Sequence, residues 1–521
     1  MLARLHGFTL LGIEAIPLTI ECDISGGLPG IHTVGLPDAA VRESAERIRS
    51  ALRHSGCDLP ARRITISLAP ADLRKQGSAL DLPIALGIVV AAGQAPPGRL
   101  HEILVAGELG LDGEVRPVRG VLTAALLAHR MALREIVVPR ANAAEAAAVA
   151  GPGVLAVQTL GEAIALLRGE CPPGSTLPTA AAAPVGIAPD LADVRGQAHA
   201  RRALEVAAAG GHHLVMIGPP GCGKSMLARR LPGILPPLLP EEAIEVSSIH
   251  SAAGLLPFGR LVERRPFRAP HHTISGIGLV GGGRGPRPGE ITLAHQGVLF
   301  LDELPEFGRA TLDVLRQPME QGEVLITREN RTLRMPARSM FVAAMNPCVC
   351  GKWGSEDRPC GCTPAMVSRY RERVSGPLFD RFDLQIGLPS VSAREMRKGT
   401  AGDRSEEVAR RVAAARGRQR ERFGSPLAVN ATMGPEALRR HVDPGPAGLR
   451  LLETAMVRLG LSARSHDAVL RVARTIADLG EKEGVSAEHV AEAIQYRNLD
   501  RFMVTGTSQG GPLGTPLTGG A

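Results

Sequence analysis

Lysine and the aromatic residues are scarce in this 521-residue chain, which has five lysines, two tyrosines and one tryptophan. Aromatic stacking is one common way to bind single-stranded nucleic acid, and this composition argues against it. The chain nevertheless has 60 basic residues against 52 acidic ones, so arginine supplies its net charge of +8. The excess leaves two explanations open: a GC-rich genome that favours arginine codons, or a polyanionic partner such as nucleic acid.

Long hydrophobic runs are also missing. The longest apolar stretches are well short of the ~20 residues that a membrane-spanning helix needs, and Glu14 interrupts the apolar N-terminal segment where a signal peptide would be unbroken. We therefore expect a cytoplasmic protein without a membrane contact, in which the eight cysteines are reduced.

The order of apolar patterns predicts a multidomain α/β protein. Residues 1–168 alternate short β-rich runs with alanine-rich helical runs, and residues 169–189 form a linker rich in proline, alanine and glycine. In residues 190–390 strands alternate with helices, which is typical of a parallel sheet covered by helices. Residues 391–502 are almost wholly helical, and residues 503–521 have the composition of a disordered tail.

A phosphate-binding loop follows the apolar run HLVMI. The sequence GPPGCGKS has its glycines, lysine and serine at the offsets of a P-loop, between a predicted strand and a predicted helix. Its glycines allow backbone amides to point at phosphate oxygens, its lysine meets the β- and γ-phosphates, and its serine offers a hydroxyl to Mg²⁺. The expected ATP-binding residues are Gly218, Pro219, Pro220, Gly221, Cys222, Gly223, Lys224 and Ser225.

Two carboxylates follow a second buried strand, in GVLFLDELPEF. Asp302 at the end of that strand is placed to hold Mg²⁺ with Ser225, and Glu303 is placed to orient and deprotonate the attacking water. This pairing with the P-loop favours hydrolysis of ATP over binding alone.

Two further polar residues end or precede later strands. Asn346 follows SMFVAAM and is expected to position the water or to sense the γ-phosphate. Arg381, in SGPLFDRFDL, is expected to be an exposed arginine finger that enters the site of a neighbouring subunit. The alternative is a surface ion pair with Asp380 or Asp383.

Four cysteines lie within fifteen residues, in CVCGKWGSEDRPCGC. Two CxC pairs this close are candidates for a structural Zn²⁺ site, although CxC is tighter than the usual pair spacing, and four reduced thiols without metal are the alternative. The candidate ligands are Cys348, Cys350, Cys360 and Cys362. The neighbouring histidines His271 and His272 are not spaced for joint metal binding and are expected to support a loop or to meet a phosphate.

The arginine-rich segment EVLITRENRTLRMPARSMF is predicted to form two strands around a turn at Glu329 and Asn330. The predicted hairpin has Arg328, Arg331 and Arg334, whose charges could follow the phosphate backbone of DNA. Solvated arginines on a strand edge are the alternative.

These motifs together resemble the AAA+ ATPases. The segments RPFRAPHHTISGIGLVGGG, LRQPMEQGEV, AAMNPCVCG and SGPLFDRFDL closely resemble the magnesium-chelatase-like YifB/ComM family of bacteria, from about residue 5 to residue 500. The resemblance implies a homo-hexameric ring that uses ATP and Mg²⁺, because a neighbour's arginine completes each site.

The resemblance also implies roles for individual residues. Lys224 takes the Walker A role, Asp302 the Walker B role with Glu303 as catalytic base, and Asn346 the sensor 1 role, while Arg381 is the arginine finger. In LGLSARSHDAVLRVARTIADL, Arg464 matches the sensor 2 position, with Arg471 as the second candidate.

The N-terminal domain resembles the proteolytic domain of Lon proteases, an S5-type fold, in GELGLDGEVRPVRGVLTAALLA and RKQGSALDLPIALG. A Ser–Lys dyad needs a hydroxyl beside a desolvated amine. The serine position falls on Ala79, with Ser78 one place earlier, and the lysine position falls on Ala124; no lysine occurs between residues 76 and 223. We expect an inactive Lon-like domain that serves assembly or DNA contact.

Three functions are compatible with these features. The first is a DNA helicase that promotes branch migration of recombination intermediates during natural transformation, with branched or single-stranded DNA and recombination proteins as partners. The second is a chelatase motor, against which the Lon-like domain and the missing DxSxS pattern argue. The third is a protein-remodelling ATPase. The basic composition and the hairpin arginines favour the DNA motor.

Overall fold

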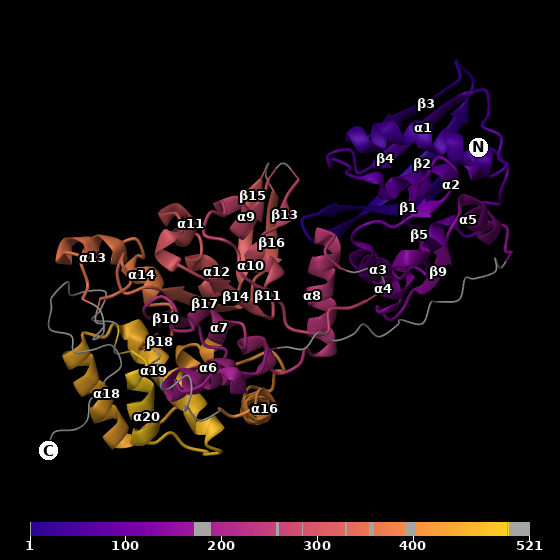
Figure 1. Cartoon of the computed structure of the whole chain (residues 1–521). Coiled ribbons are helices and arrows are strands. Elements are labelled where there is room, and N and C mark those ends of the chain that lie inside the picture. Colours follow the sequence, from indigo (N-terminus) through magenta and orange to yellow (C-terminus); the bar gives the residue numbers. More distant parts are fainter. Residues whose placement is uncertain are drawn as a thin grey trace. The chain divides into compact units, whose positions relative to one another are not determined.

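The computed structural model describes residues 2–170, 189–256, 260–283, 285–328, 331–353, 359–390, 402–497 and 499. The chain divides into two compact units, coloured along the sequence in Figure 1. The first comprises Met1–Pro184, Leu239–Glu263 and Gly283–Pro288, and the second comprises Val185–Leu238, Arg264–Gly282 and Gly289–Ala521. Within the described residues, no helix has the length and apolar character required to cross a bilayer.

A seven-stranded mixed sheet organises the first unit. Its strands, in sheet order, are β3 (Gly30–Val34), β4 (Arg63–Ala69), β2 (Glu14–Ser25), β1 (Leu2–Leu11), β5 (Ile103–Val105), β8 (Glu135–Pro139) and β9 (Gly153–Val157). The β1–β2 and β2–β4 pairs are antiparallel, whereas β5, β8 and β9 are parallel. Helices of this unit are α1 (Ala39–His54), α2 (Asp81–Ala91), α3 (Val121–Arg130), α4 (Ala143–Ala147), α5 (Leu160–Leu167) and α8 (Pro240–Ala253).

The apolar sequence of α2 accounts for its position in the core. Every residue of α2 is buried, including Asp81, whose carboxylate accepts hydrogen bonds from Arg47 at 2.7 and 3.0 Å. Burial raises the pKa of Asp81, against the opposing effect of Arg47. A buried carboxylate of this kind needs its partner, since an unpaired charge in an apolar core is costly.

Helix α8 comes from the segment between the P-loop and the acidic strand end, yet it belongs to the first unit. The carboxylate of Glu242 accepts from the amide of Leu239 at 2.9 Å at its start, and Gly254 ends it at φ 74°. Ser251 holds α8 in the first unit. The carbonyl of Ser251 accepts from the amide of Gly120 at 3.2 Å, and its hydroxyl donates to Glu145 at 2.6 Å. The sequence pattern did not predict this assignment.

A five-stranded parallel sheet organises the second unit. Its strands, in sheet order, are β11 (Phe267–Arg268), β14 (Val298–Leu301), β17 (Met340–Met345), β10 (Leu214–Ile217) and β18 (Leu384–Gly387). The runs VLFL, MFVAAM and LVMI are buried throughout, as expected for parallel strands covered on both faces. The carboxyl ends of β14, β17 and β10 therefore meet at one edge of the sheet, where open α/β sheets bind ligands.

Eight helices precede, separate or follow these strands in the described part of the second unit ahead of its C-terminal region. They are α6 (Ala198–Gly210), α7 (Lys224–Ala228), α9 (Gly276–Val280), α10 (Glu290–Leu293), α11 (Arg309–Asp313), α12 (Arg316–Gln321), α13 (Pro364–Arg371) and α14 (Gly376–Phe379).

The C-terminal part of the second unit is helical, drawn in orange and yellow in Figure 1. The guanidinium group of Arg416 donates to the carbonyl of Ala208 in α6 at 2.9 Å, which joins this region to the core. Its helices are α16 (Ser405–Phe423), α17 (Pro435–His441), α18 (Gly445–Leu459), α19 (Ala463–Leu479) and α20 (Ala487–Gln495). The predicted fold class is thereby confirmed in its layout: an α/β chain with an N-terminal domain built on a mixed sheet, a parallel P-loop core and a helical C-terminal region.

Candidate active site

The P-loop begins where β10 ends. The amide of Gly218 donates to the carbonyl of Met345 at 3.2 Å, and Gly221 and Gly223 have φ values of 82° and 93°, in the left-handed region that favours glycine. A Cβ atom at Gly218 would lie 2.6 Å from the carbonyl oxygen of Leu388. This backbone path therefore requires glycine at these positions.

Lys224 is buried beneath this loop. Its ammonium group donates to the carbonyls of Gly218 at 2.6 Å and Pro219 at 2.9 Å, and to Oδ1 of Asn346 at 3.1 Å. Burial lowers the pKa of Lys224, against the attraction of nearby acidic groups. A phosphate at this loop would replace neutral acceptors with anionic oxygens and so favour the charged amine.

Ser225 and Asp302 meet at the end of β14. The hydroxyl of Ser225 donates to the carboxylate of Asp302 at 2.6 Å, so the two predicted Mg²⁺ ligands lie side by side. A hydroxyl and a carboxylate are the oxygen donors that Mg²⁺ prefers. These residues fit the predicted metal.

Glu303 adopts φ 52°, an uncommon left-handed conformation for a residue with a side chain. Its amide donates to Oδ1 of Asp302 at 3.0 Å, and its half-exposed carboxylate lies 3.2 Å from Nδ1 of His272. The ring of His272 is 4.1 Å from that of His271. Strained backbone of this kind is common at catalytic sites, and here it accompanies a carboxylate that is 55% exposed and next in sequence to the predicted Mg²⁺ ligand Asp302.

Two contacts of this site were missed by sequence reasoning. One is the His272–Glu303 contact just described, and the other is the hydrogen bond from Nε2 of Gln197 to the carbonyl of Cys222 at 2.6 Å. Neither histidine spacing nor an isolated glutamine gave a signal, because both contacts join residues that are close only in the fold.

Arg381 was predicted to be exposed, and the structure shows it largely buried. Its side chain is 12% exposed; Nη2 lies 2.7 Å from a carboxylate oxygen of Glu320 in α12, and Nη1 donates to the carbonyl of Pro377. The partner is thus Glu320, not Asp380 or Asp383. Arg381 is correspondingly more buried than a free finger would be.

The two sensor 2 candidates have different surroundings. Arg464, near the start of α19, is 45% exposed and donates to the same oxygen of Glu320 that Arg381 contacts. Arg471 donates to the carbonyl of Ala431 at 3.2 Å and lies 4.0 Å from Asp383. Of the two, Arg464 has the more accessible guanidinium group.

The arginine-rich segment folds as an antiparallel hairpin of β15 (Glu323–Arg328) and β16 (Arg331–Pro336), with Arg328 opposite Arg331. Arg334 has a side chain that is 74% exposed and lies 3.6 Å from Glu323. The turn residues Glu329 and Asn330, and the side chains of Arg328 and Arg331, lie outside the described residues.

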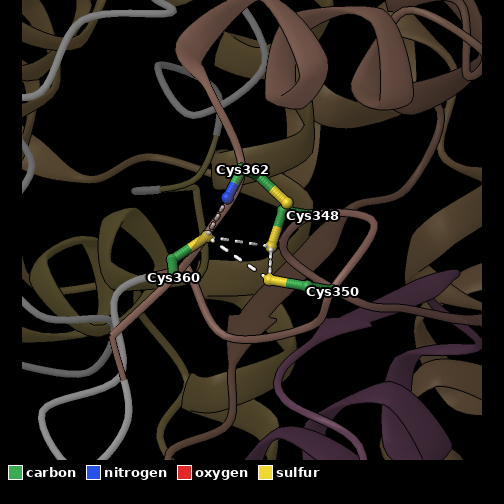
Figure 2. A group of neighbouring side chains, drawn as sticks. All are labelled: Cys348, Cys350, Cys360 and Cys362. Carbon is green, nitrogen blue, oxygen red and sulfur yellow. Dashed lines mark hydrogen bonds between the residues drawn. The ribbon is translucent and has the colours of Figure 1, made fainter.

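The four clustered cysteines converge after β17 (Figure 2). Their sulfur atoms all lie within 4.8 Å of one another. Cys348 is buried and Cys350 is exposed, so the cluster sits at the surface of the second unit.

In the N-terminal domain, the positions at which the sequence resemblance places a protease dyad are apolar. Ala124 is buried and Ala79 packs against the same hydrophobic cluster. The hydroxyl of Ser78 donates to Glu108, and the ammonium group of Lys75, the one lysine in residues 1–168, donates to the carbonyl of Pro70. These contacts use both groups in ways unrelated to a Ser–Lys dyad.

The strand-end site, its P-loop and the helical region that follows it define an AAA+ protein of the P-loop ATPase class. Models of the magnesium chelatase family match most of the chain. "Magnesium chelatase, subunit ChlI" matches residues 190–396, "Subunit ChlI of Mg-chelatase" matches residues 20–142, and "Magnesium chelatase, subunit ChlI C-terminal" matches residues 402–497.

Several curated relatives match nearly the whole chain. YifB of Salmonella typhimurium is 43% identical over 505 residues, 96% of this chain and 98% of the relative. The competence protein ComM of Haemophilus influenzae is 42% identical over 513 residues, 96% of this chain and 98% of the relative. The chain therefore belongs to the YifB/ComM family of magnesium-chelatase-like AAA+ proteins. A Lon protease of Salinispora arenicola is 28% identical over 145 residues, 26% of this chain and 18% of the relative.

Proposed function

We propose that this chain is an ATP-driven DNA motor that assembles as a homo-hexamer and promotes branch migration of recombination intermediates during natural transformation. The observation that carries the DNA assignment is the 42% identity, over 96% of the chain, to a protein named competence protein ComM. The hairpin β15–β16, with its exposed Arg334, supports a contact with the DNA backbone.

Hydrolysis would use the residues at the strand ends. Lys224 binds the β- and γ-phosphates, and the P-loop amides orient them. Ser225 and Asp302 would hold Mg²⁺, which when bound neutralises charge on the phosphates. Glu303 accepts a proton from the attacking water, and Asn346, already in contact with Lys224 at 3.1 Å, positions that water.

Arg381 would act on the neighbouring subunit. In the single chain it pairs with Glu320 at 2.7 Å and donates to the carbonyl of Pro377. Insertion into a neighbour's site would place its charge where negative charge develops on the transferred phosphoryl group. Arg464 would sense the nucleotide from the helical region of its own chain.

A chelatase-type motor that acts with a protein partner is the second candidate. The observation that favours it is the match of all three family models to magnesium chelatase subunit ChlI. Such a motor would hydrolyse ATP at the same site but would have no need of DNA.

Steady-state ATP hydrolysis distinguishes the two. The purified protein is assayed alone and with single-stranded, duplex and four-way-junction DNA at fixed salt, with Lys224→Ala as the inactive control. We expect stimulation by DNA, largest with the junction. Hydrolysis that no DNA stimulates would contradict the DNA motor and favour a protein partner.

A further inference from the structure

The four cysteines after β17 have sulfur atoms that all lie within 4.8 Å of one another, close enough to share one metal ion. Sulfur–sulfur distances are 3.5 Å for Cys348–Cys350, 3.6 Å for Cys348–Cys360 and 3.4 Å for Cys350–Cys360. Four sulfurs about 2.3 Å from one zinc ion lie about 3.8 Å apart. The observed spacing is close to that value and far from the ~2.05 Å of a disulfide bond, so it fits a metal better than a cross-link.

The surroundings of the sulfurs suit thiolates. The amide of Trp353 donates to Sγ of Cys348 at 3.3 Å, and the amide of Cys362 donates to Sγ of Cys360 at 3.4 Å. Such hydrogen bonds to ligand sulfurs orient them and stabilise their negative charge. Figure 2 shows the sulfur atoms of Cys348, Cys350 and Cys360 directed toward one another.

Positive charge lies beside this cluster. Nε of the buried Arg371 donates to the carbonyl of Pro347 at 3.3 Å, next to Cys348, and its guanidinium carbon is 5.9 Å from the centre of the Trp353 ring. Lys352, between the two cysteine pairs, is exposed. A tetrathiolate zinc centre has a formal charge of −2, from four thiolates and one dication, and these cations compensate part of it.

The same loop contacts the P-loop. Gly351 has φ 75°, and a Cβ atom there would lie 2.5 Å from Cδ of Pro220. At its other end the loop continues from Asn346, which accepts a hydrogen bond from Lys224, and Cys348 follows two residues later. The cysteine cluster is thus connected to the nucleotide loop at two points.

We propose that Cys348, Cys350, Cys360 and Cys362 bind one structural Zn²⁺ ion, and that this site supports the P-loop through the Gly351–Pro220 contact. Loss of the metal then weakens ATP binding. The metal assignment is independent of the DNA motor, whereas the coupling rests on the proposed ATP site.

Metal analysis of the full chain, purified without chelators, tests the first half. We expect about one zinc ion per chain in the wild type and almost none in the Cys360→Ser/Cys362→Ser variant. Cys57→Ser, which removes a thiol outside the cluster, is the matched control and retains zinc. A wild-type protein with fully reduced thiols and no zinc overturns the site, and iron in place of zinc overturns the choice of metal.

ATP affinity, measured with a fluorescent ATP analogue, tests the coupling. Cys360→Ser/Cys362→Ser is expected to bind the analogue at least about tenfold more weakly, as for loss of supporting contacts around a metal site. Unchanged affinity after loss of zinc overturns the coupling. Lys224→Ala retains zinc but loses nucleotide, so failure of the ATP site is distinguished from failure of the zinc site.

A second variant covers the case in which loss of two cysteines prevents folding. Gly351→Ala leaves all four ligands in place but forces a Cβ toward Pro220 in a left-handed backbone. We expect it to retain about one zinc ion per chain and to bind the analogue about tenfold more weakly. Retention of full ATP affinity by Gly351→Ala overturns the proposed contact.

Discussion

Arg381 and Glu320 form an ion pair with 2.7 Å between Nη2 and Oε1, and Arg464 donates to the same carboxylate. Glu320 is 42% exposed, so its side of the pair is open to water, whereas the Arg381 side chain is only 12% exposed. An exchange of partners therefore requires Arg381 to leave a partly buried position. A nucleotide in a neighbouring subunit would offer Arg381 a more strongly charged partner than Glu320.

Arg381→Ala is expected to bind ATP with normal affinity and to hydrolyse it about 10³-fold more slowly, because an arginine finger stabilises charge in the transition state and not in the bound ground state. Arg418→Ala, which removes a partly exposed arginine paired with Glu481 at 3.4 Å, is the control. Full turnover by Arg381→Ala would contradict the finger assignment.

Mixing tests whether the finger acts on a neighbouring chain. Arg381→Ala lacks the finger but has an intact P-loop, and Lys224→Ala lacks the P-loop lysine but retains the finger. We expect the mixture to regain part of the ATPase activity that each variant lacks, since mixed rings contain some complete sites. A mixture as inactive as its components, with mixed assembly verified, would place Arg381 in the site of its own chain.

Glu303→Gln is expected to bind ATP normally and to hydrolyse it at least about 100-fold more slowly, because an amide cannot accept the proton of the attacking water. The change preserves shape at a residue held at φ 52°, so the fold is expected to be unaffected. His272→Ala, which removes the group 3.2 Å from Glu303, serves as comparison and is expected to lose less activity. Equal rates for Glu303→Gln and the wild type would remove Glu303 as the base.

Much of this site was predictable from the sequence because its residues are fixed by local rules. A P-loop needs glycine at positive φ, and carboxyl ends of parallel strands meet at one edge, so GPPGCGKS, Asp302 and Asn346 could be brought together without coordinates. The fold class followed from the same patterns.

Long-range partners were not predictable. Arg464 and Glu320 are 144 positions apart, and His272 and Glu303 are joined only by packing. The placement of helix Pro240–Ala253 in the first unit depends on Ser251 meeting Gly120 and Glu145. Charge and periodicity describe one element at a time and do not specify which distant partner a polar group will meet.

The hairpin arginines are expected to bind DNA through its phosphates. A plot of the logarithm of the DNA-binding constant against the logarithm of the salt concentration has a negative slope. Each phosphate contact that is removed makes this slope shallower, by about 0.9 on duplex DNA and about 0.7 on single strands. Replacing Arg328, Arg331 and Arg334 by alanine is therefore expected to reduce the slope by about 2 to 3, with Arg418→Ala as control. The measurement is fluorescence anisotropy of labelled DNA across a salt series, and an unchanged slope would assign these arginines to the solvated strand edge.

Asp478 in α19 holds the helical region together, and its removal is expected to be the most destabilising change considered. The carboxylate is fully buried; it accepts from Nδ2 of Asn430 at 2.8 Å and Nη1 of Arg422 at 2.9 Å, and lies 3.0 Å from Arg474. Asp478→Ala leaves the buried Arg474 without its charge partner, which costs about 3–5 kcal/mol.

The matched control is Asp443→Ala, an exposed aspartate that accepts from the amide of Gly445 at 2.9 Å. Loss of one such exposed hydrogen bond costs about 1 kcal/mol or less. Thermal unfolding is followed by circular dichroism. The midpoint temperature of the first transition is expected to fall strongly for Asp478→Ala and only slightly for Asp443→Ala. Similar shifts for both would mean that water or a rearranged Arg422 compensates the buried charge of Arg474, and that the network around Asp478 contributes little to the stability of the helical region.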